Sequence, residues 1–156
     1  MVEKNPESKE AVLLEIARLM SIAARTSPKT RGIDNLVIVI VKGKDIKRLI
    51  TRMAYIARAY SKPSFKRDAN SLKNSKVVLL IGTKVAPLGL THCGYCGFKD
   101  CRGLSAKQGI CAYNSLDLGI ATSSAAIVAA RFFVDNRIMY SVGKAAAELG
   151  LLGKDV

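Results

Sequence analysis

All four cysteines of this chain lie between positions 93 and 111, and their spacing is Cys-x2-Cys-x4-Cys-x9-Cys. Gly94 and Gly97 follow the first two cysteines and let the backbone curl around a common centre without clashes of Cβ atoms. Four closely spaced thiolates suit an iron–sulfur cluster, here of the four-iron four-sulfur type. The candidate ligands are Cys93, Cys96, Cys101 and Cys111. Cys111 opens the next predicted helix, where the positive end of the helix dipole favours an anionic group.

The same cysteines are compatible with three other interpretations. Structural zinc also accepts four thiolates, although zinc sites usually pair two Cys-x2-Cys knuckles and this chain has one. A zinc knuckle beside a basic surface would make a nucleic-acid-binding module, with Tyr95 and Phe98 stacking on bases. The cysteines could instead be redox-active or disulfide-forming, or plain structural thiols without a metal. His92 is the only histidine, and we expect it to shape the loop, because four cysteines already complete a tetrahedral set.

Length and composition restrict the class of protein. The chain has 156 residues, which predicts a single domain over residues 1–156 with a cysteine-rich loop at 91–111. We find no run of the roughly 20 apolar residues that a membrane span requires, and the N-terminus lacks the apolar core of a signal peptide. We therefore expect a cytoplasmic protein. In that compartment thiols stay reduced, so clustered cysteines indicate metal ligands or redox groups before disulfides.

The formal net charge is +13, from 25 Lys and Arg against 12 Asp and Glu. An iron–sulfur cluster would contribute about −2, so most of the excess would remain. It is compatible with a solvated basic surface, with docking of an acidic redox partner protein, or with nucleic acid. No nucleic-acid-binding motif supports the last of these, so nucleic acid is disfavoured. The chain also lacks paired catalytic carboxylates, a nucleophile–base set and a P-loop. The cations crowd the middle third of the chain, at Lys42, Lys44, Lys47, Arg48, Lys62, Lys66, Arg67, Lys73 and Lys76.

The hydrophobic pattern predicts an α+β (α/β layered) fold, in which helices flank a small sheet of buried central strands. Continuous apolar runs at 36–41 and 77–81 predict two strands buried on both faces. One helix between them, from an Asp45 N-cap to about Tyr60, would make a right-handed crossover and a parallel pair. A loop is expected over 61–76. The other predicted helices run from near Asn5 to about Ala24, over 112–133 and over 137–149.

The cysteine segment HCGYCGFKDC resembles the Cys-Gly-x-Cys-Gly-x-x-x-Cys pattern that binds four-iron four-sulfur clusters in electron-transfer and carbon-monoxide-metabolism proteins. The fourth cysteine comes sooner here than in those proteins. Over almost its whole length, the chain is similar to a family of small uncharacterised prokaryotic proteins containing a ferredoxin domain. This resemblance implies a cluster and supplies no reaction. The likeness is carried by residues 24–29, 32–35, the cysteine segment, 117–121 and 135–146.

A second resemblance concerns flavin. Residues 23–29 (AARTSPK), followed by Asn35 and a buried strand, resemble a segment of nitroreductase-like flavoproteins, and residues 112–122 are similar to their central helix. The resemblance implies a nitroreductase-like fold, and a homodimer with FMN at the subunit interface. This chain differs from the nitroreductase-like pattern in two ways. Leu36 and the two following residues replace Gln-Pro-Trp, and a separate Arg-x-Ser-x-Arg phosphate motif is missing. The cofactor-binding candidates are Arg25, Thr26, Ser27, Lys29, Asn35 and Thr122.

Cations and hydroxyl donors at a turn beside a helix end also suit a flavin phosphate on physical grounds. The alternative is a solvated basic turn whose Thr26 and Ser27 make only local backbone bonds. The function that the sequence favours is a cytoplasmic iron–sulfur electron-transfer protein that works with a redox partner protein. With bound flavin it would be an FMN-dependent oxidoreductase. The alternative function is a zinc-stabilised nucleic-acid-binding module.

Overall fold

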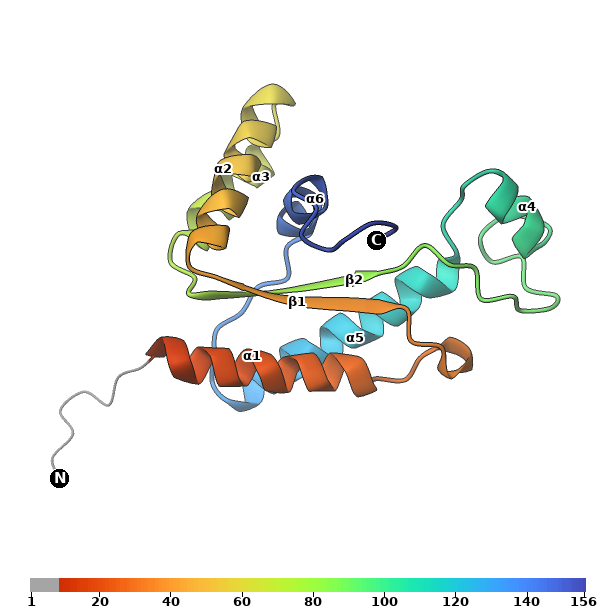
Figure 1. The fold of residues 1–156 in the computed structure, drawn as a ribbon, viewed down its shortest axis with the longest axis horizontal. Coiled ribbons are helices and arrows are strands. Elements are labelled where there is room, and N and C mark those ends of the chain that lie inside the picture. The colour runs from red at the N-terminus through yellow and green to blue at the C-terminus, as the bar shows by residue number, and fades with distance from the viewer. Residues whose placement is uncertain (1–8) are drawn as a thin grey trace, which may run out of the picture.

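Two antiparallel strands separate two groups of helices in the computed structural model, which describes residues 9–156 (Figure 1). Strand β1 (Leu36–Lys42) pairs with β2 (Val77–Thr83), so that Leu36 lies opposite Thr83 and Lys42 lies opposite Val77. Helices and strands thus combine in an α+β fold, and the predicted class is confirmed.

Helices cover both faces of this sheet (Figure 1). On one face lie α1 (Lys9–Thr26) and α5 (Ala112–Arg131). On the other lie α2 (Lys44–Ala59), α3 (Pro63–Leu72) and α6 (Tyr140–Glu148). The short helix α4 (Cys101–Ala106) and the 3-10 turn η1 (Thr30–Gly32) belong to connecting segments.

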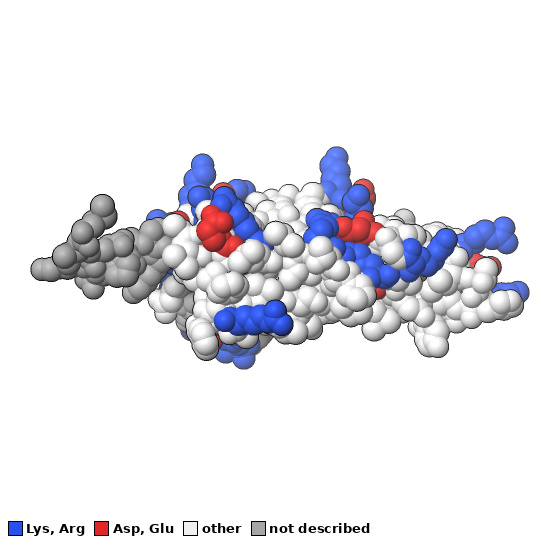
Figure 2. All heavy atoms as spheres, turned by 90° about the horizontal axis from the view of Figure 1, so that it is seen from below, with Lys and Arg blue, Asp and Glu red and all other residues white. Residues whose placement is uncertain are grey.

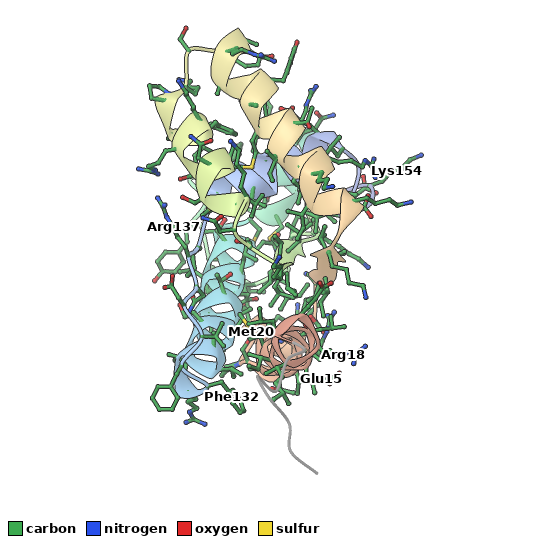
Figure 3. The ribbon with its side chains drawn as sticks, turned by 90° about the vertical axis from the view of Figure 1, so that its left-hand side faces the viewer. Glu15, Arg18, Met20, Phe132, Arg137 and Lys154 are labelled. Atoms are coloured by element: carbon green, nitrogen blue, oxygen red, sulfur yellow. The ribbon has the colours of Figure 1, made fainter. Side chains whose placement is uncertain are left out.

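The two strands contribute side chains to two separate cores, because successive residues of a strand point to opposite faces. Val39 and Val41 of β1 pack with α2, α3 and α6. Leu36 and Ile38 pack with α1 and α5. Figure 3 shows Met20 between α1 and α5, in the second of these cores. The continuous apolar runs that predicted both strands therefore reflect burial on two sides.

The predicted parallel pairing is wrong, because β1 and β2 are antiparallel. The reason lies in residues 61–76, which were expected to form a loop and instead contain α3. A proline occupies the first turn of α3, where its missing N–H costs nothing. Phe65, Ala69 and Leu72 then bury one face of the helix in the core. Helices α2 and α3 form a helical hairpin, which returns the chain so that β2 runs back along β1.

The predicted helices are confirmed with adjusted ends. The helix expected over 112–133 is α5, and the one expected over 137–149 is the shorter α6. Gly43 occupies the N-cap position of α2 in a left-handed conformation (φ 57°), so the predicted Asp45 N-cap is wrong. Asp45 lies in the first turn and accepts a hydrogen bond from Arg48. The predicted helix start near Asn5 lies outside the described residues.

Asp68 is a buried carboxylate that joins α3 to α6. It accepts hydrogen bonds from Ser141 Oγ at 2.6 Å and Arg67 Nε at 2.9 Å, and Arg137 Nη2 lies 3.1 Å away. Burial alone would raise the pKa of Asp68, but the bonds from Arg67 and Ser141 and the charges of both arginines hold this pKa below its usual value. The ionised carboxylate therefore stabilises the contact between the two helices.

Asp68→Ala should lower the free energy of unfolding at pH 7 by about 1–3 kcal/mol, because Ser141 is left buried without its acceptor. The folded-state pKa lies below the unfolded value, so this stabilisation is present above about pH 4 and disappears as the pH falls through the folded pKa. Urea titrations between pH 3 and pH 7 measure both effects. The control is Asp45→Ala, which removes a more exposed ion pair with Arg48 and should cost about 0–1 kcal/mol. An equal pH dependence of wild type and Asp68→Ala would contradict this account.

Candidate functional site

The segment between β2 and α5 extends from one end of the layered body and carries the four cysteines (Figure 1). It has a small apolar core of its own, formed by Leu88, Leu104 and Cys111. Cys96, Phe98 and Tyr113 are partly buried and pack against these residues. This core folds the segment back on itself and draws residues that are distant in sequence together.

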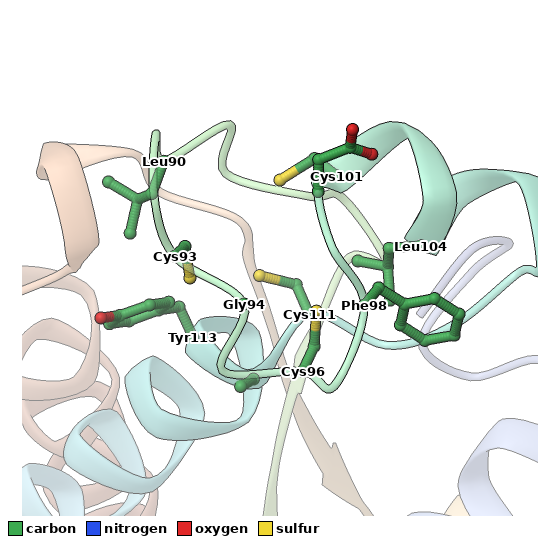
Figure 4. Close-up of a pocket in the computed structure, with 11 residues that line it drawn as sticks. Leu90, Cys93, Gly94, Cys96, Phe98, Cys101, Leu104, Cys111 and Tyr113 are labelled. Carbon is green, nitrogen blue, oxygen red and sulfur yellow. The ribbon is translucent and has the colours of Figure 1, made fainter.

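All four cysteine side chains line one small cavity (Figure 4). Its volume is about 20 Å³, and Figure 4 shows the four sulfur atoms pointing inward from different parts of the segment. The surrounding wall is mainly apolar and includes Leu90, Phe98, Leu104 and Tyr113. All four cysteines are free thiols, and Cys111 is the buried one. The structure thus brings the predicted ligand set together.

Two glycines give the segment its curvature at the cavity. Gly94 and Gly97 have φ values of 72° and 81°, and the Gly97 amide donates to the Gly94 carbonyl at 2.9 Å. A Cβ atom on Gly97 would meet no atom within 4 Å, so this position favours glycine for its backbone conformation and not for lack of space. His92 also has a positive φ of 50°. Its side chain is exposed and does not line the cavity.

Local capping fixes the position of Cys101, the first residue of α4. The Asp100 carboxylate accepts a hydrogen bond from the Gly103 amide at 2.8 Å, which satisfies a free donor at the start of the helix. A Cβ atom on Gly109 would lie 2.5 Å from Leu104 Cδ1, so the chain after α4 also packs closely against it. These contacts orient Cys101 toward the cavity.

The other end of the segment is held by α5. Cys111 occupies the N-cap position of this helix, next to the positive end of the helix dipole. The ring of Tyr113 lines the cavity and packs edge-on against Tyr95 at a centroid distance of 6.0 Å. Partial burial raises the pKa of the Tyr113 hydroxyl, and the charges of Cys93, Tyr95 and Cys111 raise this pKa further.

The last turn of α1 and the turn that follows it hold four of the predicted flavin contacts, Arg25, Thr26, Ser27 and Lys29. Arg25 Nη1 donates to Asp34 Oδ2 at 2.6 Å and to the Leu36 carbonyl at 2.9 Å. Burial alone would raise the pKa of Asp34, but bonds from Arg25 and the Leu36 amide, with nearby positive charge, hold this pKa below its usual value. These bonds join the end of α1 to the start of β1.

The remaining polar groups of this turn bond to nearby backbone. Thr26 Oγ1 and Ser27 Oγ donate to carbonyls of α1 at 2.9 and 2.8 Å. Lys29 Nζ donates to the Arg25 carbonyl at 2.5 Å and the Ser27 carbonyl at 3.0 Å. Thr122 lies apart from them on α5, where its hydroxyl donates to the Leu118 carbonyl. Asn35 precedes β1, and its carbonyl accepts from the Lys84 amide.

Two tertiary contacts that sequence reasoning missed join this turn to the cysteine segment. The buried Asp117 carboxylate of α5 accepts bonds from the Thr30 amide at 3.1 Å and the Thr30 hydroxyl at 2.9 Å. Arg31 Nη1 donates to the Leu88 carbonyl at 2.6 Å. The available sequence signal was Asp117, the one carboxylate within the sequence of α5.

Among residues 9–156, no three His, Cys, Asp or Glu side chains are placed so that they could hold a single metal ion. A tetrahedral zinc site would require Zn–S distances of about 2.3 Å, and hence sulfurs close to one another. The four sulfurs surround a cavity without converging on one point. In the same part of the chain, no helix has the length and apolar character of a membrane span.

Fold and site together define an α+β protein with a four-cysteine segment. The sequence profile described as "Uncharacterized protein containing a ferredoxin domain (DUF2148)" matches residues 107–156, which include Cys111. An uncharacterized protein of Archaeoglobus fulgidus is 38% identical over 148 residues, which cover 90% of this chain and 80% of the relative. The chain belongs to the family that this profile describes. The ferredoxin domain in the family's description indicates a role in electron transfer.

The fold is also similar to that of a BluB-like flavoprotein from Clostridium difficile 630. The two chains are 20% identical, with a TM-score of 0.54, and the match covers 95% of this chain and 74% of the flavoprotein. This likeness concerns the fold, and it agrees with the flavoprotein resemblance in the sequence. Nothing in these comparisons points to nucleic-acid binding.

Proposed function

We propose that this protein is a cytoplasmic iron–sulfur electron-transfer protein that exchanges electrons with a redox partner protein. Cys93, Cys96, Cys101 and Cys111 would hold a four-iron four-sulfur cluster. The observation that carries the proposal is the single cavity lined by all four cysteine side chains. The ferredoxin domain of the family description supports it, and the reducing cytoplasm would keep the thiols available. When bound, such a cluster supplies reversible one-electron transfer.

The residues around the cavity fit an anionic, polynuclear group. Cys111 is the N-cap of α5, and the positive end of a helix dipole favours an anionic group in general. Leu90, Phe98 and Leu104 keep the inner wall apolar. A cavity of about 20 Å³ has room for about one water molecule, so cluster binding requires the cysteine segment to move outward. Its position at one end of the molecule gives it space to do so (Figure 1).

Cys96→Ser should remove most of the iron and sulfide from anaerobically purified protein, because a hydroxyl replaces one of four thiolate ligands. Wild type should contain about four irons per chain and show broad visible absorption that bleaches on reduction. Metal analysis and absorption spectra measure this, with Ser105→Ala in α4 as a control that keeps all four cysteines. A colourless wild-type protein with zinc, or unchanged iron in Cys96→Ser, would contradict the proposed ligand set.

We further propose that FMN binds at the turn after α1, which would make the protein an FMN-dependent oxidoreductase. Arg25, Thr26, Ser27 and Lys29 supply two cations and two hydroxyls there, and Asn35 and Thr122 complete the set that the flavoprotein resemblance implies. Arg25 and Lys29 now bond to Asp34 and to backbone carbonyls. Phosphate oxygens would compete for these donors. The likeness of fold to a flavoprotein supports this second cofactor.

Heating the purified protein should release a yellow, fluorescent flavin, measured in the supernatant. Lys29→Gln should raise the Kd for added FMN by about tenfold, because one charge-assisted hydrogen bond is lost. Lys47→Gln on α2 removes the same charge from a different layer and should leave the Kd unchanged. The flavin proposal fails if wild type releases no flavin and fluorescence titration detects no binding of added FMN.

We also propose that the outer face of α1 and α5 pairs with a second copy of the chain. Figure 2 looks onto this side of the molecule, where much of the surface between the charged clusters is uncharged. Because each chain carries a net charge of +13, self-association is favoured through a face that holds few cations. The exposed apolar side chains of the two helices are Val12, Leu19, Ile22, Leu116, Ile120 and Ile127.

Ile127→Asp should shift the protein from dimer to monomer, because two carboxylates would be brought into an apolar interface. Sedimentation velocity or light scattering measures the mass. Tyr60→Asp is the matched control, since Tyr60 is exposed on the opposite layer, where α2 ends. A monomeric wild type, or equal dissociation by both substitutions, would contradict this interface.

A further inference from the structure

The end of the molecule that holds the cysteine cavity is positively charged. Residues 84–111 contain four Lys or Arg and a single carboxylate, so this segment alone has a net charge of +3. Figure 2 shows basic side chains at this end. The four cations are exposed, and none has an ion-pair partner within residues 9–156. They are Lys84, Lys99, Arg102 and Lys107.

The carboxylate in this segment does not neutralise these cations by direct contact. Asp100 uses one oxygen to accept the Gly103 amide at the start of α4. The charge of Lys99 and Arg102 is also close to the cavity, since they lie two residues before and one residue after Cys101. Helix α4 is about 9 Å long, which is shorter than the Debye length of about 10 Å at 0.1 M salt.

Two exposed apolar side chains lie in the same segment as this charge. Tyr95 is 77% exposed and Ile110 is 62% exposed. The Tyr95 ring packs edge-on against Tyr113, which lines the cavity. The exposed Tyr95 ring is therefore connected to the cysteine cavity through its contact with Tyr113. Exposed apolar side chains accompanied by polar and charged groups are typical of surfaces that bind another protein.

We infer that this cationic end is the docking surface for an acidic redox protein, whose carboxylates face Lys99, Arg102 and Lys107. The inference rests on the proposed function, because it places the partner beside the group held by the cysteines. A cluster held by the cysteines would supply one-electron transfer to or from this partner, with no bond formed or broken. The cations of α2 and α3 lie toward the other end of the molecule (Figure 1), so they are screened from this contact.

Two small electron acceptors of opposite charge test the inference without an identified partner. Reduced anaerobic protein is mixed in a stopped-flow instrument with the anionic cobalt(III)–EDTA complex or with cationic hexaammineruthenium(III). The rate with the anion should fall by about tenfold when salt is raised from low to physiological concentration, and the rate with the cation should rise. Rates that respond to salt in the same way for both acceptors would overturn the inference.

A charge-reversal pair separates local charge from net charge. Lys99→Glu with Arg102→Glu should slow oxidation by cobalt(III)–EDTA by about tenfold and weaken its salt dependence. Lys44→Glu with Lys47→Glu on α2 makes the same change in net charge and should alter the rate by less than about twofold. Equal effects of the two pairs would overturn the inference. If the first pair does not fold, Lys84→Glu with Lys107→Glu replaces it, with the same expected result.

Cluster content is measured in every sample before the kinetics, so the two proposals fail separately. A wild type without iron contradicts the proposed function. A wild type with a full cluster and rates insensitive to the charge of the acceptor contradicts only the docking surface. Binding of a single-stranded oligonucleotide is measured on the same proteins. If the Lys99→Glu, Arg102→Glu variant keeps its oxidation rate but loses oligonucleotide binding, the docking surface is overturned in favour of a nucleic-acid surface.

Discussion

The cysteine segment has little regular structure beyond α4, so its position depends on how its ends are anchored. Thr30 bonds to Asp117 across 87 positions of sequence, and Arg31 bonds to the carbonyl of Leu88. The first bond fixes the turn after α1 against α5, six residues beyond Cys111. The second fixes the same turn against the chain that enters the cysteine segment. The turn proposed to bind flavin and the cavity proposed to bind a cluster are therefore held beside each other through α5.

Sequence patterns predicted those parts of the fold that are dominated by one physical effect. The strands were predictable because Val39 and Ile38 pack against cores on opposite faces of the sheet, which makes the run continuously apolar. The direction of β2 was not predictable, because it depends on the presence of α3. The sequence of α3 is mostly polar, and its helical state relies on Phe65 and Leu72 packing in the core. The cysteine spacing predicted a shared ligand set, and all four cysteine side chains line one cavity. The bond between Thr30 and Asp117 depends on tertiary packing, which spacing along the chain does not encode.

The fold also distributes the excess positive charge unevenly. Residues 42–76, which include α2, α3 and their connections, carry 11 of the 25 Lys and Arg side chains. The outer face of α1 and α5 has uncharged areas between its charged clusters (Figure 2). The cysteine end has its own smaller group of cations. This separation would allow two different contacts, because dissolved salt screens the charge of each region from the others over about 10 Å. An apolar face can pair with a copy of itself while the cationic end attracts an acidic partner.

Native mass spectrometry of anaerobically purified protein tests the central claim most directly, because it weighs the folded chain together with whatever its thiols retain. The account predicts that each chain carries the added mass of four irons and four sulfides, and that this mass is lost when Cys93, Cys96, Cys101 or Cys111 is replaced. A chain that retains one zinc, or one that carries no added mass although its thiols are reduced and protected from air, would contradict it.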